Sequence, residues 1–188
     1  VRRAFIYSSH PRSRQWVRDA PTRYRPNEAD MKITQIRTRV LAIPLRGRYH
    51  WAIGAPEGFN TLLLEVHTDD GVVGYGEALG TRSAVAAEAT IRSVEHLLLG
   101  QDPFRVEYLL ATMYRSGAWT TQRHFANQSF AGIEMALWDI CGKALGQPVH
   151  NLLGGKFHDE IHWFGFLQGG GPDELAADAR RYVERGFD

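Results

Sequence analysis

The sequence has a single cysteine, Cys141, among its 188 residues, which excludes an internal disulfide framework and suits a reducing compartment. No apolar run approaches the roughly 20 residues that a membrane-spanning helix needs. Charge of neither sign prevails, because 22 Lys and Arg stand against 21 Asp and Glu, for a net charge of +1. A chain so nearly neutral gives no general reason to expect nucleic acid or a membrane as partner. We therefore expect a cytoplasmic protein.

The composition, 44% hydrophobic and 23% charged, is typical of a soluble globular protein with a buried core. The first thirty residues differ, with seven arginines against three acidic residues and with three helix-breaking prolines. We predict that residues 1–30 are a basic, disordered leader outside the fold. A targeting peptide, a gene prediction extended too far, a remnant of cloning and a nucleic-acid-binding arm remain open as its origin.

Three extended segments follow, at about 33–43, 61–68 and 72–78. In the second, Leu62, Leu64 and Val66 alternate with more polar residues, the period of a half-buried strand. Asp69-Asp70-Gly71 is a strong hairpin signal because glycine tolerates the positive φ of the turn. These segments predict a three-stranded antiparallel meander.

Apolar residues at helical spacing predict helices over 84–99, from Asp102-Pro103 onward, and over 129–145. Residues 116–128 are predicted to be a polar and aromatic connection. After residue 155 the period changes again: 161–167 is predicted to be a largely buried strand, and Pro172 starts a helix that Gly186 ends. A strand, a glycine loop and a helix make half of a βαβ unit. A parallel sheet needs more than one strand, so this half needs partners.

The segments 129–143 and 148–154, together with 74–78 and 100–103, resemble the mandelate racemase/muconate lactonizing enzyme family of the enolase superfamily. The resemblance covers residues 31–188. It implies an α+β fold in which an N-terminal capping domain, residues 31–155, precedes the first βα unit of a (β/α) barrel, residues 156–188. Since a barrel of eight such units needs about 250 residues, we expect the chain to be the N-terminal part of a longer enzyme.

The resemblance also implies a reaction. Members abstract the α-proton of a small carboxylate substrate, such as a sugar acid, and Mg²⁺ stabilises the enediolate that forms. The parent would be a homo-oligomeric acid-sugar dehydratase, cycloisomerase or racemase. Its bases and metal ligands are expected beyond Asp188, so we expect this fragment alone to be inactive and to bind no Mg²⁺. The alternative is a non-catalytic binding or assembly module that reuses the cap.

Two loops and one strand end could touch substrate in the parent. The loop over 46–56 is expected to close over the active site, although its aromatic residues could equally fasten it to the cap. Arg123 and His124 lie in the second loop, where solvated side chains are common, and Gln168 ends the first barrel strand. The candidates are Tyr49, His50, Trp51, Arg123, His124 and Gln168.

The charged residues of the family signature are interpreted as structural. Asp139 and Lys143 are four residues apart on one helix, a spacing that supports a salt bridge. Glu77 is expected at a strand end near a domain junction. The histidines follow no metal-ligand spacing.

Overall fold

The computed structural model describes residues 31–47, 49, 54, 56–79, 83–116 and 123–187. The predicted leader, residues 1–30, lies outside the described residues, as do His50 and Trp51.

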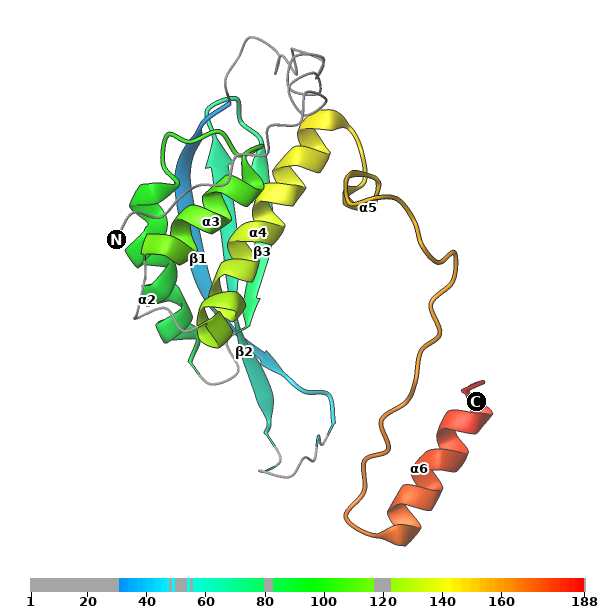
Figure 1. Cartoon of the computed structure of the whole chain (residues 1–188). Helices are drawn as coiled ribbons and strands as arrows, with labels where there is room; N and C mark the ends of the chain where they lie inside the picture. The colour runs from blue at the N-terminus through cyan, green and yellow to red at the C-terminus, as the bar shows by residue number, and fades with distance from the viewer. Residues whose placement is uncertain are drawn as a thin grey trace, which may run out of the picture. The chain divides into compact units, whose positions relative to one another are not determined.

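The sheet is the predicted meander. Strands β1 (Ile33–Pro44), β2 (Gly58–Thr68) and β3 (Val73–Leu79) pair antiparallel in the order β1-β2-β3 (Figure 1). Gly71 turns the β2–β3 hairpin with φ of 87°, a value that glycine adopts without strain. Pairing of β1 with β2 extends to Pro44 opposite Gly58, so β2 begins three residues earlier than the alternating pattern predicts.

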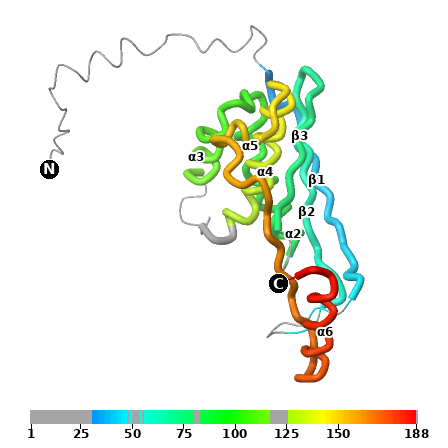
Figure 2. Tube along the Cα trace, turned by 90° about the vertical axis from the view of Figure 1, so that its right-hand side faces the viewer, coloured from blue at the N-terminus to red at the C-terminus, as the bar shows by residue number. Residues whose placement is uncertain are grey.

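The helices are α2 (Ala84–Val94), a 3₁₀ turn over Glu95–Leu97, α3 (Val106–Ser116), α4 (Arg123–Leu145), α5 (Val149–Leu152) and α6 (Pro172–Glu184). Helices α2, α3 and α4 lie on one side of the sheet (Figure 2). The core lies between these two layers. Its largest fully buried side chains are Phe130, Ile33, Ile36, Leu62, Leu64, Ile91, Leu98, Leu109, Met113, Ile133, Leu137 and Ile140.

Two helix starts differ from the sequence prediction. Helix α3 begins at Val106 because the Asp102 side chain accepts a hydrogen bond from the Phe104 N–H at 2.9 Å, which closes a turn before the helix. Helix α4 begins six residues before the predicted start. Ala126, which is buried, continues the apolar stripe of this helix one turn before the buried Phe130.

Helix α4 lies unusually close to β3. A Cβ atom on Gly76 would stand 1.8 Å from the carbonyl oxygen of Gly132, and one on Gly74 would stand 2.0 Å from that of Ala136. Only hydrogen fits between the two backbones at these positions. The glycines of the signature segments therefore permit the contact that joins the two layers.

The prediction of a largely buried strand over 161–167 is wrong in this structure. The segment is assigned to no strand, and Ile161, Trp163 and Phe164 are 73%, 80% and 75% exposed. The described part of the chain offers no parallel neighbour to complete a hydrogen-bond ladder, so the apolar pattern has nothing to be buried against. The helix that should follow does form, as α6.

Candidate functional site

Tyr49 links the β1–β2 loop to two other parts of the molecule. Its ring makes edge-on contacts with Phe59 of β2, at 5.8 Å between centroids, and with Phe166, at 6.4 Å. Phe166 in turn contacts Phe164 edge-on at 5.1 Å. These are ordinary aromatic pair geometries. The base of the loop is closed by a hydrogen bond from the Leu45 N–H to the Glu57 carbonyl at 2.9 Å.

Gln168 lies two residues after Phe166, on a stretch of chain fixed to α6. Its backbone N–H donates to a carboxylate oxygen of Asp178 at 2.8 Å, and Arg181 pairs with the same carboxylate. Asp178 is only 6% exposed, so its two donors stabilise a charge that burial would otherwise disfavour. Tyr49 thus contacts the segment 161–167 at Phe166, two residues before the other candidate, Gln168.

Arg123 and His124 do not lie in a loop as predicted, because they form the first turn of α4. Their side chains are outside the described residues, as are the whole of His50 and Trp51. Phe59 is a residue that the sequence reasoning missed. Its pairing opposite Ile43, at the loop end of the hairpin, is set by the strand register and was not indicated by any local pattern.

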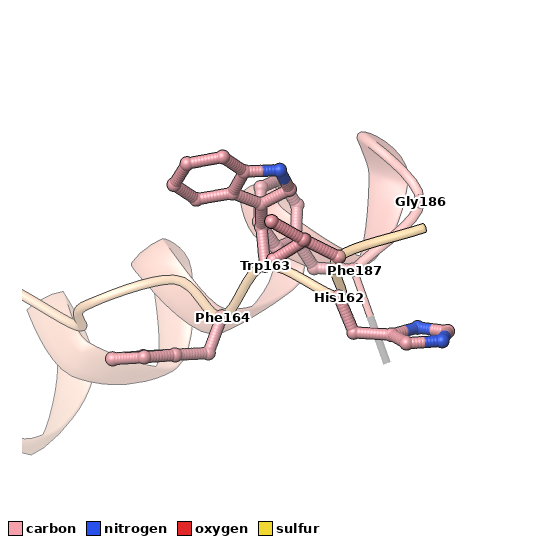
Figure 3. A pocket seen from close by; sticks show the side chains of 6 residues that line it. His162, Trp163, Phe164, Gly186 and Phe187 are labelled. Carbon is pink, nitrogen blue, oxygen red and sulfur yellow. The ribbon is translucent and has the colours of Figure 1, made fainter. Parts of the chain in front are cut away.

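The segment 161–167 also borders a hollow of about 390 Å³, which is lined by Ile161, His162, Trp163, Phe164, Gly186 and Phe187 (Figure 3). The side chains of Trp163 and His162 point away from each other. His162 is the only ionisable residue among these six, so the hollow suits an apolar cover better than a carboxylate ligand. The sequence reasoning did not predict it.

Among the described residues, two groups have shifted pKa values, and both lie in the packed layer of the cap. Burial, and secondly the charge of Asp102, raises the pKa of Cys141 to about 11. Burial, and secondly the charge of Glu134, raises the pKa of Tyr114, whose hydroxyl donates to Asn127 at 2.7 Å. The thiol is therefore protonated at neutral pH and is not an activated nucleophile.

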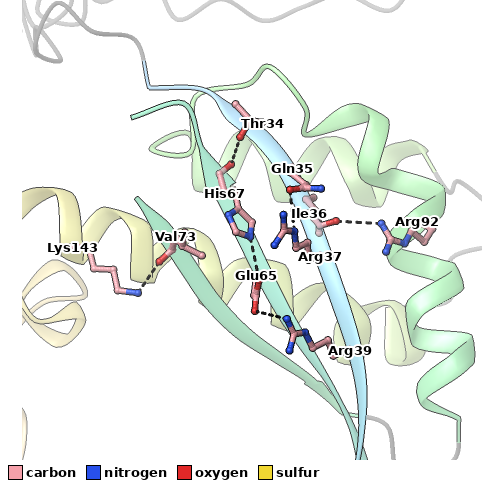
Figure 4. A network of polar contacts seen from close by, with 10 residues as sticks. All are labelled: Thr34, Gln35, Ile36, Arg37, Arg39, Glu65, His67, Val73, Arg92 and Lys143. Atoms are coloured by element: carbon pink, nitrogen blue, oxygen red, sulfur yellow. Dashed lines mark hydrogen bonds and ion pairs between the residues drawn. The ribbon is translucent and has the colours of Figure 1, made fainter. Parts of the chain in front are cut away.

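Asp139 and Lys143, charged residues of the signature, form hydrogen bonds with backbone groups along the unpaired edge of β3. Asp139 accepts the Tyr75 N–H at 2.8 Å and pairs with Lys143 at 2.6 Å, which confirms the predicted salt bridge. Lys143 also donates to the Val73 carbonyl at 2.7 Å (Figure 4). Both side chains thereby occupy backbone groups that would otherwise be open to another strand. Glu77 accepts the Thr61 hydroxyl at 2.7 Å.

Within the described ranges, no three His, Cys, Asp or Glu side chains come together in a way that could hold a metal ion. None of the helices in that part of the chain combines the length and apolarity needed to span a bilayer.

Residues 33–154 match the family described as mandelate racemase/muconate lactonizing enzyme, N-terminal domain. The chain belongs to this family of the enolase superfamily. The chain is 37% identical over 157 residues to D-galactonate dehydratase of Verminephrobacter eiseniae, an alignment that covers 84% of this chain and 37% of the relative. It is 39% identical over 127 residues to the D-galactonate dehydratase of Pectobacterium atrosepticum, covering 68% of this chain and 33% of that protein. The chain thus spans about a third of the length of these relatives.

Solved structures of family members carry the same fold. The N-succinyl Arg/Lys racemase of Bacillus cereus superposes with a TM-score of 0.71 at 29% identity, over 82% of this chain and 42% of that one. The dipeptide epimerase of Enterococcus faecalis, solved with Mg and the dipeptide L-Leu-L-Tyr, superposes with a TM-score of 0.73 at 27% identity, over 84% and 44%. The expected α+β cap, a three-stranded antiparallel sheet followed by helices, is confirmed.

Proposed function

We propose that this chain is the N-terminal part of a Mg²⁺-dependent enolase-superfamily dehydratase that removes water from a sugar acid after abstracting its α-proton. Residues 31–155 are its capping domain and residues 156–188 the first βα unit of its barrel. The observation that carries the proposal is the 37% identity to a D-galactonate dehydratase over 157 residues, a stretch that includes more than the cap alone.

The role of the cap in this enzyme is to close over the substrate. The Tyr49 contact with Phe166 supports this role, because it joins the β1–β2 loop to the segment that ends at Gln168. A loop held there excludes water from a reaction in which charge develops. We propose Tyr49, His50, Trp51, Arg123, His124 and Gln168 as substrate-binding residues. The hydroxyl of Tyr49 and the amide of Gln168 suit hydrogen bonds to the hydroxyls of a sugar acid, and the guanidinium of Arg123 suits its carboxylate.

Mg²⁺ supplies stabilisation of the enediolate in such an enzyme. The described residues of this chain offer no set of donors for it, so we assign no step of the reaction to them through the metal. We propose that bases and metal ligands belong to later barrel strands, that the chain alone is inactive, and that the parent is a cytoplasmic homo-oligomer. Calorimetric titration of the chain with Mg²⁺ tests the metal assignment, and specific tight binding would contradict it.

The function is tested in a chimera. Residues 31–187 replace the aligned N-terminal part of the V. eiseniae dehydratase, and dehydration is measured on a panel of aldonic acids with and without Mg²⁺. The control is the same junction with the N-terminal part of the P. atrosepticum relative. We expect Mg²⁺-dependent dehydration of at least one acid, with a KM that Gln168→Ala changes more than kcat. A folded chimera that is inactive on the whole panel, beside an active control, would refute the proposal.

A further inference from the structure

Helix α6 buries a charge rather than its apolar residues. Asp178, at 6% exposed, is the one buried residue of this helix, whereas Leu175 and Val183 are 37% and 66% exposed. A carboxylate is rarely buried, because the loss of its hydration costs free energy unless hydrogen-bond donors replace the water. The burial of Asp178 therefore has a cause other than apolar packing.

The donors to Asp178 connect it to the candidate site. The backbone N–H of Gln168 donates to one carboxylate oxygen at 2.8 Å, and Arg181 pairs with the other oxygen. Hydrogen bonds to an ionised group are about twice as strong as neutral ones. The buried charge of α6 is thus spent on the backbone of a residue that we propose to bind substrate.

A second carboxylate repeats this contact one helical turn earlier. Glu174 accepts the Gly170 N–H at 2.8 Å. Four residues of helix rise about 6 Å and two residues of extended chain about 6.6 Å, so the carboxylates of Glu174 and Asp178 match the N–H groups of Gly170 and Gln168. Between them, a Cβ on Gly169 would stand 2.9 Å from the Glu174 Cβ. The glycine loop is therefore held to the first turns of α6.

The same face of the helix continues along the segment before the loop. Residues 174, 178 and 182 are four apart and share one helix face. A Cβ on Gly165 would stand 2.6 Å from a ring carbon of Tyr182, so this ring lies directly on the backbone. Helix α6 thus turns back along residues 165–170 and fastens them by one face (Figure 1).

The bond to Asp178 also limits where a strand over 161–167 ends. The Gln168 N–H is occupied by the carboxylate, so a ladder with a neighbouring strand of the proposed barrel has to stop before this residue. Active sites of such barrels are built from residues at the carboxyl ends of the strands. Gln168 lies at that end, with its backbone held from α6.

We propose that Asp178 is a positioning residue for Gln168. Its buried carboxylate fixes the Gln168 backbone, and because backbone conformation restricts side-chain rotamers, it also fixes the direction of the Gln168 amide. Glu174 assists by restraining Gly170, whose backbone is otherwise free to adopt many conformations. Asp178 acts through Gln168 and does not itself touch substrate. This inference rests on the proposed function, in which Gln168 binds the sugar acid.

NMR of the full chain tests the positioning without any reaction. Three-bond couplings give the χ1 populations of Gln168. We expect one dominant rotamer in the unmodified chain and in Asp178→Asn, which keeps an oxygen acceptor, and averaged rotamers in Asp178→Ala. Glu184→Ala, which removes an exposed carboxylate at the other end of α6, is the matched control and should resemble the unmodified chain.

Two results would overturn the positioning. One is a Gln168 side chain already averaged in the unmodified chain, and the other is a side chain that Asp178→Ala leaves unchanged. If Asp178→Ala loses the helical chemical shifts of α6, the unmodified chain still decides. A coupling across the hydrogen bond between the Gln168 nitrogen and the Asp178 carboxyl carbon is then expected beside the dominant rotamer, and its absence contradicts the proposal.

The chimera described above tests the effect on substrate. Asp178→Ala should raise KM about tenfold and change kcat less than about threefold, because it loosens a substrate contact and leaves the bases in place. Asp178→Asn should restore KM to within about twofold. In a Gln168→Ala background, Asp178→Ala should have no further effect on KM, since its effect passes through that side chain. Additive effects would show a general role in the fold and overturn the proposal.

The two experiments separate this inference from the proposed function. A folded chimera that is inactive on every acid, beside a single Gln168 rotamer that depends on Asp178, refutes the reaction and leaves the positioning in place. An averaged Gln168 side chain in the unmodified chain refutes the positioning even where the chimera is active.

Discussion

Replacing Gly76 by alanine tests how closely α4 packs on the sheet. The added Cβ would stand 1.8 Å from the Gly132 carbonyl oxygen, 2.9 Å from the carbonyl carbon and 3.1 Å from the Ala136 nitrogen. All three are backbone atoms of one helix, so no side-chain rotation can relieve the clash. Ordinary contact at 3.4 Å requires the helix and strand to separate by about 1.6 Å.

That separation is costly because the helix covers the core. Ile133, Leu137 and Ile140 of α4 are fully buried, and moving the helix outward loosens their contacts with the sheet. Overpacking a core costs about 1–3 kcal/mol, and a clash between two backbones belongs at the upper end. The lower chain entropy of alanine in the unfolded state offsets less than about 1 kcal/mol of this. A net loss of about 2–3 kcal/mol lowers Tm by roughly 4–12 °C in a chain of this size.

Thermal and urea unfolding of the full chain, followed by far-UV circular dichroism, measure the effect. Gly47→Ala is the matched control, because a Cβ at Gly47 meets nothing within 4 Å and its φ is not in the left-handed region. The control should melt within about 2 °C of the unmodified chain, as surface substitutions generally do. If Gly76→Ala melts with the control, α4 does not approach β3 as closely as the structure shows.

Three further predictions concern single side chains. Asp139→Ala leaves the Tyr75 N–H without its carboxylate acceptor, and because the site is partly exposed we expect a loss of only about 1 kcal/mol, measured by thermal melts. The unmodified chain should lose stability from pH 9 toward pH 11, because the Cys141 thiol ionises first in the unfolded state; urea midpoints should show no such decline in Cys141→Ala if the thiol is its cause. Asp178→Ala should speed amide hydrogen exchange at Gln168, and unchanged exchange there would contradict the hydrogen bond between them.

Local signals were sufficient for most of the cap. The alternation of Leu62, Leu64 and Val66 and the turn at Gly71 predicted the meander, because each depends on neighbours in the sequence. The first turn of α4 was missed because polar residues there hide an apolar stripe that the buried Ala126 continues. A helix start of this kind depends on packing rather than on a capping signal.

The candidate site was harder to predict because its residues come from separate segments. The sequence indicated Tyr49 and Gln168 individually, but it gave no distance between the β1–β2 loop and the segment after α5. The edge-on contact of Tyr49 with Phe166 supplies that link, and Phe59 completes it from β2. Arg123 and His124 were assigned to a loop that is helical, so their proposed role now depends on which way the first turn of α4 presents them.

The segment 161–167 shows what a hydrophobic pattern does and does not measure. Its residues have the composition of a buried strand, yet Trp163 and Phe164 are 80% and 75% exposed. Burial and a strand ladder are both properties of a pair of elements, so one element cannot acquire them alone. The neighbouring α6 supplies part of the packing, since the Tyr182 ring covers the backbone of Gly165. Ile161, Trp163 and Phe164 nevertheless stay largely exposed, which agrees with the proposal that further barrel strands cover them in the parent enzyme.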